Sequence, residues 1–311
     1  MKTIIMKNYQ TDESRAASRL RCASVFALLR RDKSPRQGVE SKPNAAPCDL
    51  RSRHVSRFTF HASAFTIVEL LVVISIIGIL AAMLLPVLAK AKVAAQKKQA
   101  AVEISQIVGA IQQYDSVYGR FPVSAVDQAL AGTNDFTCGG SGYDIAGVNQ
   151  LWTMGITNNG EVMAILMDIT AYSNGVQTVN YKHVKNPQQT IFLNAKMSGD
   201  TRSPGVGADL VYRDPWGNPY VITMDLSYDE QCRDSNYCQQ AVSQNPPGAT
   251  YVQTGFNGLF NPNMNATTPD QLNDFLYHGK VMVWSAGPDR KIDPALPANL
   301  GVNKDNVLSW Q

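Results

Sequence analysis

Histidine and cysteine are scarce in this chain of 311 residues, which holds four and five of them respectively. Cys232 and Cys238 have neither a Cys-x2-Cys pair nor a His-x3-His motif beside them, so the spacing typical of a zinc site is missing. A phosphate-binding loop and a dinucleotide fingerprint are missing too. A catalytic triad built on His183 or His278 stays open as an alternative, but nothing identifies a nucleophile. We therefore expect no enzyme activity and assign no catalytic residue.

The five cysteines form two groups along the chain. Cys22 and Cys48 lie in a basic segment at the start, and Cys138, Cys232 and Cys238 lie well after it. In an oxidising compartment, Cys232 and Cys238 are close enough in sequence to close a small loop. We predict this disulfide, which leaves Cys138 unpaired.

Charge is nearly absent between Phe65 and Leu88, where Glu69 is the only ionisable side chain. These twenty-four residues make roughly 36 Å of helix, and a hydrocarbon core is about 30 Å thick. The stretch is therefore predicted to span a membrane. A carboxylate within such a span is costly and normally has a partner or a role. The natural partner for Glu69 is a protonated α-amino group. The simpler alternative is a plain single-pass anchor whose Glu69 reaches the headgroups.

Residues 1–64 are strongly basic. They hold thirteen Lys and Arg against five Asp and Glu, a charge of about +8, whereas the rest of the chain is near −5. The positive-inside tendency keeps this segment cytoplasmic and exports the domain after the helix, although four lysines between Lys90 and Lys98 weaken the contrast. The segment ends at the small residue Ala64. A cut there would retain the apolar helix and make Phe65 the first residue, so we expect 1–64 to be a removable leader.

The local pattern Ala64-Phe65-Thr66-Ile67-Val68-Glu69-Leu70-Leu71, with Gly78 and Pro86 downstream, resembles the type IV pilin and pseudopilin superfamily. The family usually has glycine where this chain has Ala64. The resemblance implies cleavage between Ala64 and Phe65 by a prepilin peptidase and methylation of the new amine. It also implies that Glu69 neutralises the terminal amine of a neighbouring subunit during assembly. Pro86 removes a helical hydrogen bond, and a kink or local unwinding is expected there.

Beyond Pro86 the apolar residues keep a helical period, with Lys, Gln and Glu between them. Gly119 and Pro122 are stop signals, so one long helix is predicted over residues 65–118, of which 65–88 form the transmembrane half. The apolar face of the second half needs a sheet to cover it. We therefore predict an α+β fold, in which a long N-terminal helix packs on an antiparallel β-sheet that precedes a C-terminal loop.

Residues 119–311 are predicted to form the exported domain. Residues 123–187 are glycine-rich and carry no assignable motif, so we interpret them as a variable region that holds one short helix over 161–169. Strand-like runs come next. They lie near 190–193, 210–212, 220–224 and 280–285, with an edge candidate at 307–310.

Asp214, Pro215, Trp216 and Gly217 open the segment Asp-Pro-Trp-Gly-Asn-Pro-Tyr. Proline fixes one backbone angle, glycine permits an unusual one, and the aspartate can hold a turn through its side chain. We expect a rigid turn that leads into a strand. The segment also resembles the signature of the type II secretion major pseudopilin. A sugar platform formed by Trp216 and Tyr220 is the alternative.

Three carboxylates near the end of the sequence suggest a cation site. Calcium prefers six to eight oxygen ligands, which Asp289, Asp293 and Asp305 begin to supply. The arrangement resembles the C-terminal calcium loop of major pseudopilins, with Arg290 where glycine is common. Calcium is therefore the expected cofactor. The alternative is a metal-free loop pinned by Asp–Arg or Asp–Lys pairs.

These resemblances imply a structural subunit of a pseudopilus-type filament for type II protein secretion. Expected partners are further copies of the chain, other pseudopilins, prepilin peptidase, an inner-membrane assembly platform and membrane lipid; no nucleic acid is expected. The expected location is the inner membrane, crossed once, with the C-terminal domain in the periplasm or outside the cell. A type IV pilus subunit for adhesion, motility or DNA uptake is one alternative, and a membrane-anchored binding protein is another.

Overall fold

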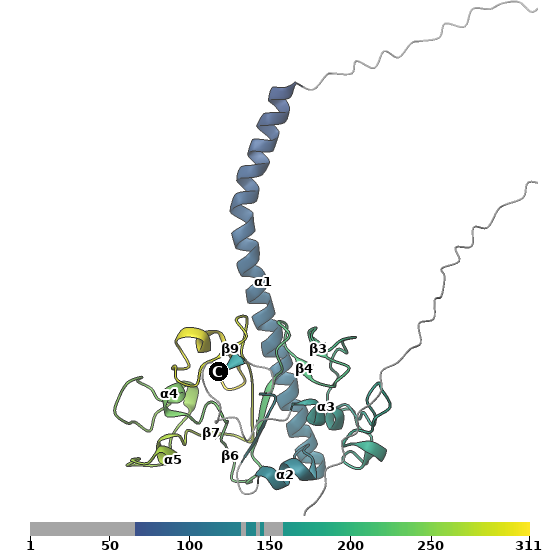
Figure 1. The fold of residues 1–311 in the computed structure, drawn as a ribbon, viewed down its shortest axis with the longest axis vertical. Helices are drawn as coiled ribbons and strands as arrows, with labels where there is room; N and C mark the ends of the chain where they lie inside the picture. Colours follow the sequence, from purple (N-terminus) through teal and green to yellow (C-terminus); the bar gives the residue numbers. More distant parts are fainter. Residues whose placement is uncertain (1–65, 132–134, 141–143, 146–157) are drawn as a thin grey trace, which may run out of the picture. The chain divides into compact units, whose positions relative to one another are not determined.

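The computed structural model describes residues 66–131, 135–140, 144–145 and 158–311. Its dominant element is the helix α1 (Ile67–Tyr118) of 52 residues, which projects from the globular part of the protein (Figure 1). Thr66 caps its start, since the Glu69 amide donates to the Thr66 hydroxyl at 3.2 Å. Gly119 ends it in the left-handed conformation, φ 63°, and its N–H bonds to the Asp115 carbonyl. The predicted long helix is therefore present.

α1 is continuous through Pro86. Proline has no N–H to donate to the preceding turn, so one backbone hydrogen bond is missing there. Unwinding at Pro86 stays a prediction for the assembled state.

The central sheet is antiparallel, with the strand order β1-β5-β8-β10. Its strands are β1 (Phe136–Cys138), β5 (Val221–Met224), β8 (Val281–Ser285) and β10 (Val307–Leu308). Together with α1 this sheet confirms the predicted α+β architecture.

Alternate residues of the central strands pack into two different cores, because successive side chains of a strand point to opposite faces of the sheet. Ile222 and Val283 pack in one core with Ile107 of α1. Val221 and Trp284 belong to a second core on the other face, which also holds aromatic side chains from the loops. The sheet thus joins the long helix to a second apolar cluster.

Shorter elements surround this centre. The helices are α2 (Ala125–Ala131), α3 (Gly160–Leu166), α4 (Gln240–Ser243) and α5 (Pro269–Leu272). The two-stranded pairs are β2 (Asp144–Ile145) with β9 (Lys291–Ile292), β3 (Gly205–Val206) with β4 (Tyr212–Arg213), and β6 (Gln231–Cys232) with β7 (Tyr277–His278). Single 3-10 turns lie at Tyr181–His183, Phe256–Gly258 and Gly301–Asp305.

One strand expectation is wrong. Residues 190–193 are not part of a sheet. The amides of Phe192 and Leu193 both donate to the Leu166 carbonyl, at 2.9 and 3.1 Å, and so complete the end of α3. The sheet strand β1 instead comes from the region that the sequence predicts to be variable.

Candidate functional site

Glu69 lies on the first turn of α1 and is exposed to solvent. Its Oε2 accepts hydrogen bonds from the Thr66 amide at 2.9 Å and from the Thr66 hydroxyl at 2.8 Å. This arrangement is a capping box, in which the two side chains satisfy each other's backbone amides. The carboxylate therefore sits at the end of the helix nearest the predicted cut. Ala64 and Phe65, the predicted processing residues, lie outside the described residues.

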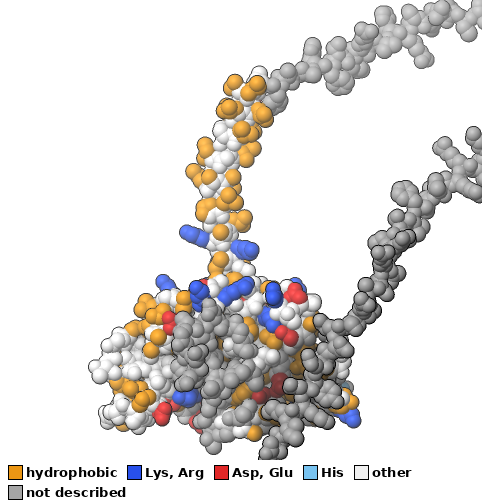
Figure 2. Space-filling view, in the orientation of Figure 1, with side chains coloured by type: hydrophobic (Ala, Val, Ile, Leu, Met, Phe, Trp, Pro, Cys, Tyr) orange, Lys and Arg blue, Asp and Glu red, His pale blue; other side chains and the backbone are white. Residues whose placement is uncertain are grey.

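The first half of α1 has no protein to pack against. Ile77 is 58% exposed and Leu85 66% exposed, and the apolar side chains around them are similarly uncovered (Figure 2). Within the described part of the chain, α1 is the one helix long and apolar enough to cross a membrane. So large an apolar surface requires lipid or other protein to cover it.

The second half of α1 is embedded in the domain. Ile104, Ile107 and Ile111 recur at helical spacing and are at most 1% exposed. Glu103 accepts a hydrogen bond of 2.5 Å from the Tyr220 hydroxyl. Burial, together with the nearby Glu103 carboxylate, raises the pKa of Tyr220 far above its usual range. Tyr220 is therefore a neutral donor that joins the turn before β5 to the helix.

The Asp-Pro-Trp-Gly turn is built around the buried carboxylate of Asp214. It accepts hydrogen bonds from the amides of Trp216 and Asn218, from the Asn218 side chain and from the Ser285 hydroxyl. Burial raises the pKa of Asp214, and the bond from Ser285 opposes that effect. Because Ser285 belongs to β8, the carboxylate fixes the turn to the central sheet.

Two other contacts define how this turn is placed. Gly217 has φ 90°, and a side chain there would collide with the Arg202 carbonyl, so glycine is required. The Gln96 side chain of α1 donates to the Pro215 carbonyl at 3.3 Å. Tyr220 is fully buried, so it cannot form a sugar platform with Trp216. The turn acts as a structural joint between α1 and the sheet.

The C-terminal loop brings two of the three predicted calcium ligands near one another. Asp305 has a buried carboxylate oxygen with no hydrogen-bond partner among the described residues. Burial and the neighbouring Asp289 carboxylate raise the pKa of Asp305. A buried acceptor beside a second carboxylate fits a hard cation. Arg290 forms no ion pair with any residue that the structure describes; it donates to the Trp216 carbonyl.

Asp293 does not join the other two carboxylates. Its backbone is held by Asn303, which accepts from its amide and donates to its carbonyl, and its Oδ1 caps the Ala295 amide at 2.9 Å. In the described part of the chain no group of three or more His, Cys, Asp or Glu side chains is placed to hold a metal. No described Lys or Arg forms an ion pair with Asp289 or Asp305 within 4.0 Å. The alternative of a metal-free loop held by Asp–Arg or Asp–Lys pairs therefore has no support among these residues.

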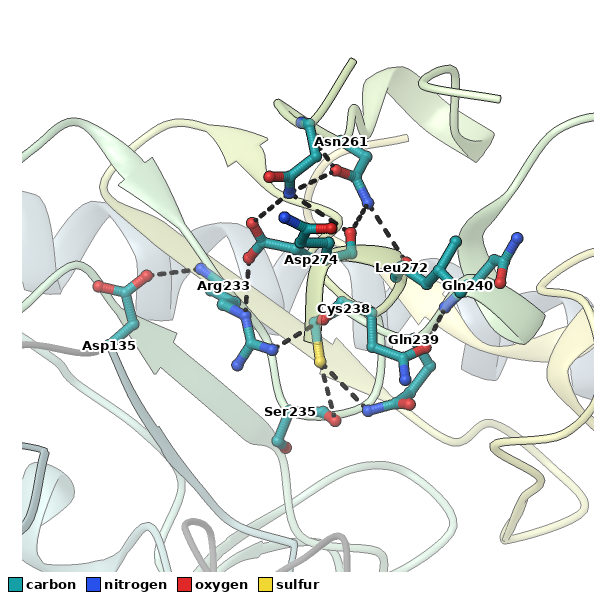
Figure 3. Close-up of polar contacts among 12 residues, drawn as sticks. Asp135, Arg233, Ser235, Cys238, Gln239, Gln240, Asn261, Leu272 and Asp274 are labelled. Atoms are coloured by element: carbon teal, nitrogen blue, oxygen red, sulfur yellow. Dashed lines mark hydrogen bonds and ion pairs between the residues drawn. The ribbon is translucent and has the colours of Figure 1, made fainter. Parts of the chain in front are cut away.

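The predicted disulfide is not formed. Cys232 and Cys238 are separate buried thiols, as is Cys138. The Cys238 sulfur instead contacts the Ser235 carbonyl at 3.5 Å and the Gln239 amide group at 3.4 Å (Figure 3). Burial raises the pKa of the Cys238 thiol to about 11. Six residues of spacing permit a bridge but do not orient the two side chains toward each other.

His183 and His278, the two histidines considered for a triad, make structural contacts. His183 Nδ1 lies 2.8 Å from Asp168 Oδ1, which also accepts from Asn180. His278 stacks on Phe260 with 4.0 Å between ring centroids. Among the described residues, neither imidazole is hydrogen-bonded to a serine, threonine or cysteine, so the geometry gives no support to a triad.

Several polar residues that organise the domain have no recognisable sequence signal. Asp234 accepts from the Thr223 hydroxyl and the Trp284 indole, at 2.6 and 3.0 Å. Next to it, Arg233 joins three segments: its guanidinium bonds to Asp274 at 3.1 Å, and its amide donates to Asp135 at 2.6 Å (Figure 3). These contacts pin the loops after β5 to the start of β1. Only the folded chain brings such distant polar residues together.

Residues 60–85 match the model of the prokaryotic N-terminal methylation motif. This segment includes the predicted cut, Glu69 and most of the exposed half of α1. The chain carries a type IV pilin-like prepilin signal. The match supports the type IV pilin and pseudopilin superfamily and fits a membrane-anchored, pilin-like subunit. No curated protein and no solved structure matches the chain. The pilin-like motif implies processing by a prepilin peptidase and assembly into a filament in general.

Proposed function

We propose that this pilin-like chain is a structural, non-enzymatic subunit of a pseudopilus-type filament for type II protein secretion. The observation that carries the proposal is the uncovered apolar half of α1 with Glu69 as its one charge. In the membrane this surface faces lipid, and in a filament it would face the same surface of other copies. The secretion assignment is supported by the Asp-Pro-Trp-Gly turn and by the acidic C-terminal loop.

The proposed route to the filament begins with removal of residues 1–64. A peptidase cut between Ala64 and Phe65 leaves an α-amino group four residues before Glu69. A neighbouring subunit's Glu69 would neutralise that amine, because two opposite charges are costly to bury unless they meet. Other pseudopilins and an inner-membrane assembly platform are the proposed partners. The domain after α1 would be exported to the periplasm or the cell exterior.

Two measurements test this route. Mass spectrometry of the purified protein should find Phe65 at the N-terminus, with or without a methyl group. Glu69→Gln should leave membrane insertion unchanged but reduce filament yield about tenfold or more, because it leaves the neighbouring amine unpaired. The matched control is Glu69→Asp, which keeps the charge and should retain more of the yield. An intact leader would contradict the proposed cleavage. Normal filament yield from Glu69→Gln would show that Glu69 does not neutralise the neighbouring amine.

The pilus alternative rests on the same helix and predicts the same filament. Deletion of the gene separates the two functions. Loss of exported enzymes supports secretion, and loss of attachment, movement or DNA uptake with normal secretion supports a pilus.

We further propose that Asp289 and Asp305 bind calcium when it is present. The unpartnered oxygen of Asp305 supports this assignment. The melting temperature of the full chain in detergent should rise with calcium, because a ligand that binds only the folded state stabilises it. Magnesium should act less, since it prefers a tighter octahedral site. Asp289→Asn should remove most of the effect, whereas Asp293→Asn should keep it. A melting temperature that does not respond to calcium would contradict the assignment.

A further inference from the structure

Positive side chains gather where α1 enters the globular domain. Figure 2 shows Lys and Arg at the lower end of the apolar part of α1 and again along the adjoining side of the domain. We define the basic collar as four lysines of α1 and two arginines beside the Asp-Pro-Trp-Gly turn: Lys90, Lys92, Lys97, Lys98, Arg202 and Arg290. Lys97 is half-buried, and the other five are exposed.

Contacts with the Asp-Pro-Trp-Gly turn place the two arginines at the same level as the lysines. The side chain of Gln96, which lies between the two lysine pairs, bonds to the Pro215 carbonyl. Arg290 donates to the carbonyl of the next residue, Trp216, and the Arg202 carbonyl lies against Gly217. The collar therefore lies where the domain first contacts the helix, beside the Asp-Pro-Trp-Gly turn.

The collar is not neutralised within the protein. Among the described residues, no Asp or Glu lies within 4.0 Å of any of its six charged groups. The carboxylates of Asp200 and Asp289 lie on the same side and keep their negative charge, but they accept hydrogen bonds from backbone amides and form no ion pair with a collar side chain. Lys97 is near enough to Asp305 to lower the pKa of that carboxyl, while burial raises it. The six positive charges of the collar outnumber these three carboxylates. The collar therefore keeps a net positive charge that faces outward.

The length of α1 sets how far the collar lies from a membrane. Leu88 is the last residue of the apolar run and Gln96 is the first with a hydrogen bond to the domain, so about 12 Å of helix separates them. A headgroup layer is roughly 5 to 8 Å thick on each side of a bilayer. Lys90 and Lys92 then lie within that layer, and the remaining collar residues lie just beside it.

We propose that the basic collar binds the phosphate groups of anionic phospholipids in the leaflet on the exported side. The proposal rests on α1 spanning the membrane and not on filament assembly. Lysine and arginine close to an anionic surface are attracted to it, and the attraction weakens within a Debye length. Once the leader is removed, these are the basic residues that flank the span. They would hold the subunit at a fixed depth and would release lipid when it leaves the membrane.

The test compares lipid preference in the full chain. Native mass spectrometry of the protein in neutral detergent measures bound phosphatidylglycerol against phosphatidylcholine with the same acyl chains, at low and high ammonium acetate. The wild type should prefer phosphatidylglycerol, less so at high salt. Lys90→Gln/Lys92→Gln should lower that preference by about 25-fold, because each near-surface lysine contributes about fivefold. Circular dichroism should show an unchanged helix content, since both side chains are exposed.

The matched control removes two positive charges elsewhere. Arg120→Gln/Lys182→Gln changes exposed residues beyond the far end of the helix and should keep the lipid preference within about twofold. An equal loss in both variants, or a wild type that binds both lipids equally, would overturn the proposal. So would a collar variant that binds lipid normally but fails to form filaments, because the collar would then contact a neighbouring subunit. Competition by inorganic phosphate as strong as by phosphatidylglycerol would also overturn it, since a lipid surface would not be required.

Discussion

The two halves of α1 differ in what covers them. Ile77, in the first half, is 58% exposed, whereas Ile107, in the second, is fully buried against the sheet. Both are isoleucines on one continuous helix with similar local propensity. The first half is therefore stable only in lipid or in an assembly, and the second is part of an ordinary protein core. One helix thus belongs to two environments, and the Asp-Pro-Trp-Gly turn marks the boundary between them.

The largest difference in stability is expected between two variants in which an isoleucine of each half of α1 is shortened to alanine. Ile107→Ala should lower the free energy of unfolding by about 3 to 4 kcal/mol, because it leaves a cavity in the core. Ile77→Ala should change it by less than about 0.5 kcal/mol, because no protein packs there. Urea denaturation of the full chain in detergent measures both. Equal losses would mean that the two halves are stabilised in the same way.

A change at the boundary should have the next largest effect. Asp214→Ala leaves the amides of Trp216 and Asn218 and the Ser285 hydroxyl without their buried acceptor, at a cost of about 3 kcal/mol. Asp200→Ala removes an aspartate that also caps its own turn but is exposed, and should cost much less. The comparison is again made by denaturation. If both changes cost the same, the buried position of Asp214 has no special importance.

A smaller loss of stability is expected when the hydrogen bond from the Tyr220 hydroxyl to α1 is removed. Tyr220→Phe removes the donor to Glu103 of α1 and should cost about 2 kcal/mol, since the acceptor is charged. Tyr251→Phe removes a hydroxyl that bonds to the Asn263 carbonyl, away from α1, and should cost about 1 kcal/mol. Thermal unfolding of both variants measures the difference. A Tyr220→Phe protein as stable as wild type would show that the helix is held by packing alone.

The smallest effect is a change of stability with pH that comes from Glu161. This residue belongs to α3, which packs beside the second half of α1. Burial and a hydrogen bond with Asp127 raise the pKa of Glu161 to about 7 from 4.5. Between those values the folded protein binds more protons than the unfolded chain, so stability falls as pH rises from about 4.5 to 7. Because the side chain is partly exposed, the change should be about 1 kcal/mol.

Glu161→Gln tests this dependence. It should flatten the fall in stability across that range, measured by denaturation at several pH values. Burial also raises the pKa of Asp135 to about 6, so a shallower slope of the same sign should remain. Asp135→Asn provides the control for that residual slope. A variant with an unchanged slope would exclude Glu161 as its source.

The sequence predicts those parts of the fold whose signal is local. The helical period and Gly119 define α1, and the β-branched runs define β5 and β8. β1 gives no such signal, because it has three residues beside a pair of glycines and becomes a strand only by pairing with β5. Residues 190–193 have strand-like composition, but the amides of Phe192 and Leu193 bond to the Leu166 carbonyl at the end of α3 instead of to a strand.

In the candidate site, too, the sequence predicts the features made by neighbouring residues and misses those made by distant ones. The positions of Glu69 and Asp214 could be read from short motifs, because the capping box and the turn are each made by residues close in sequence. The sequence does not show that Asp293 is held by Asn303, because only the fold brings these two residues together. The same applies to Cys232 and Cys238, whose side chains face different neighbours.

The hydrogen bond from Tyr220 to Glu103 crosses 117 residues of sequence, and the ion pair of Lys280 with Asp115 crosses 165. The buried face of α1 is therefore made early in synthesis, and its partners are made much later. As the chain is made, that face stays uncovered until β5 and β8 follow. Contacts so distant in sequence form slowly, because the entropy of closing a long loop is lost before the contacts stabilise the chain. A membrane that holds the first half of the helix would keep waiting chains apart and so protect them from aggregation.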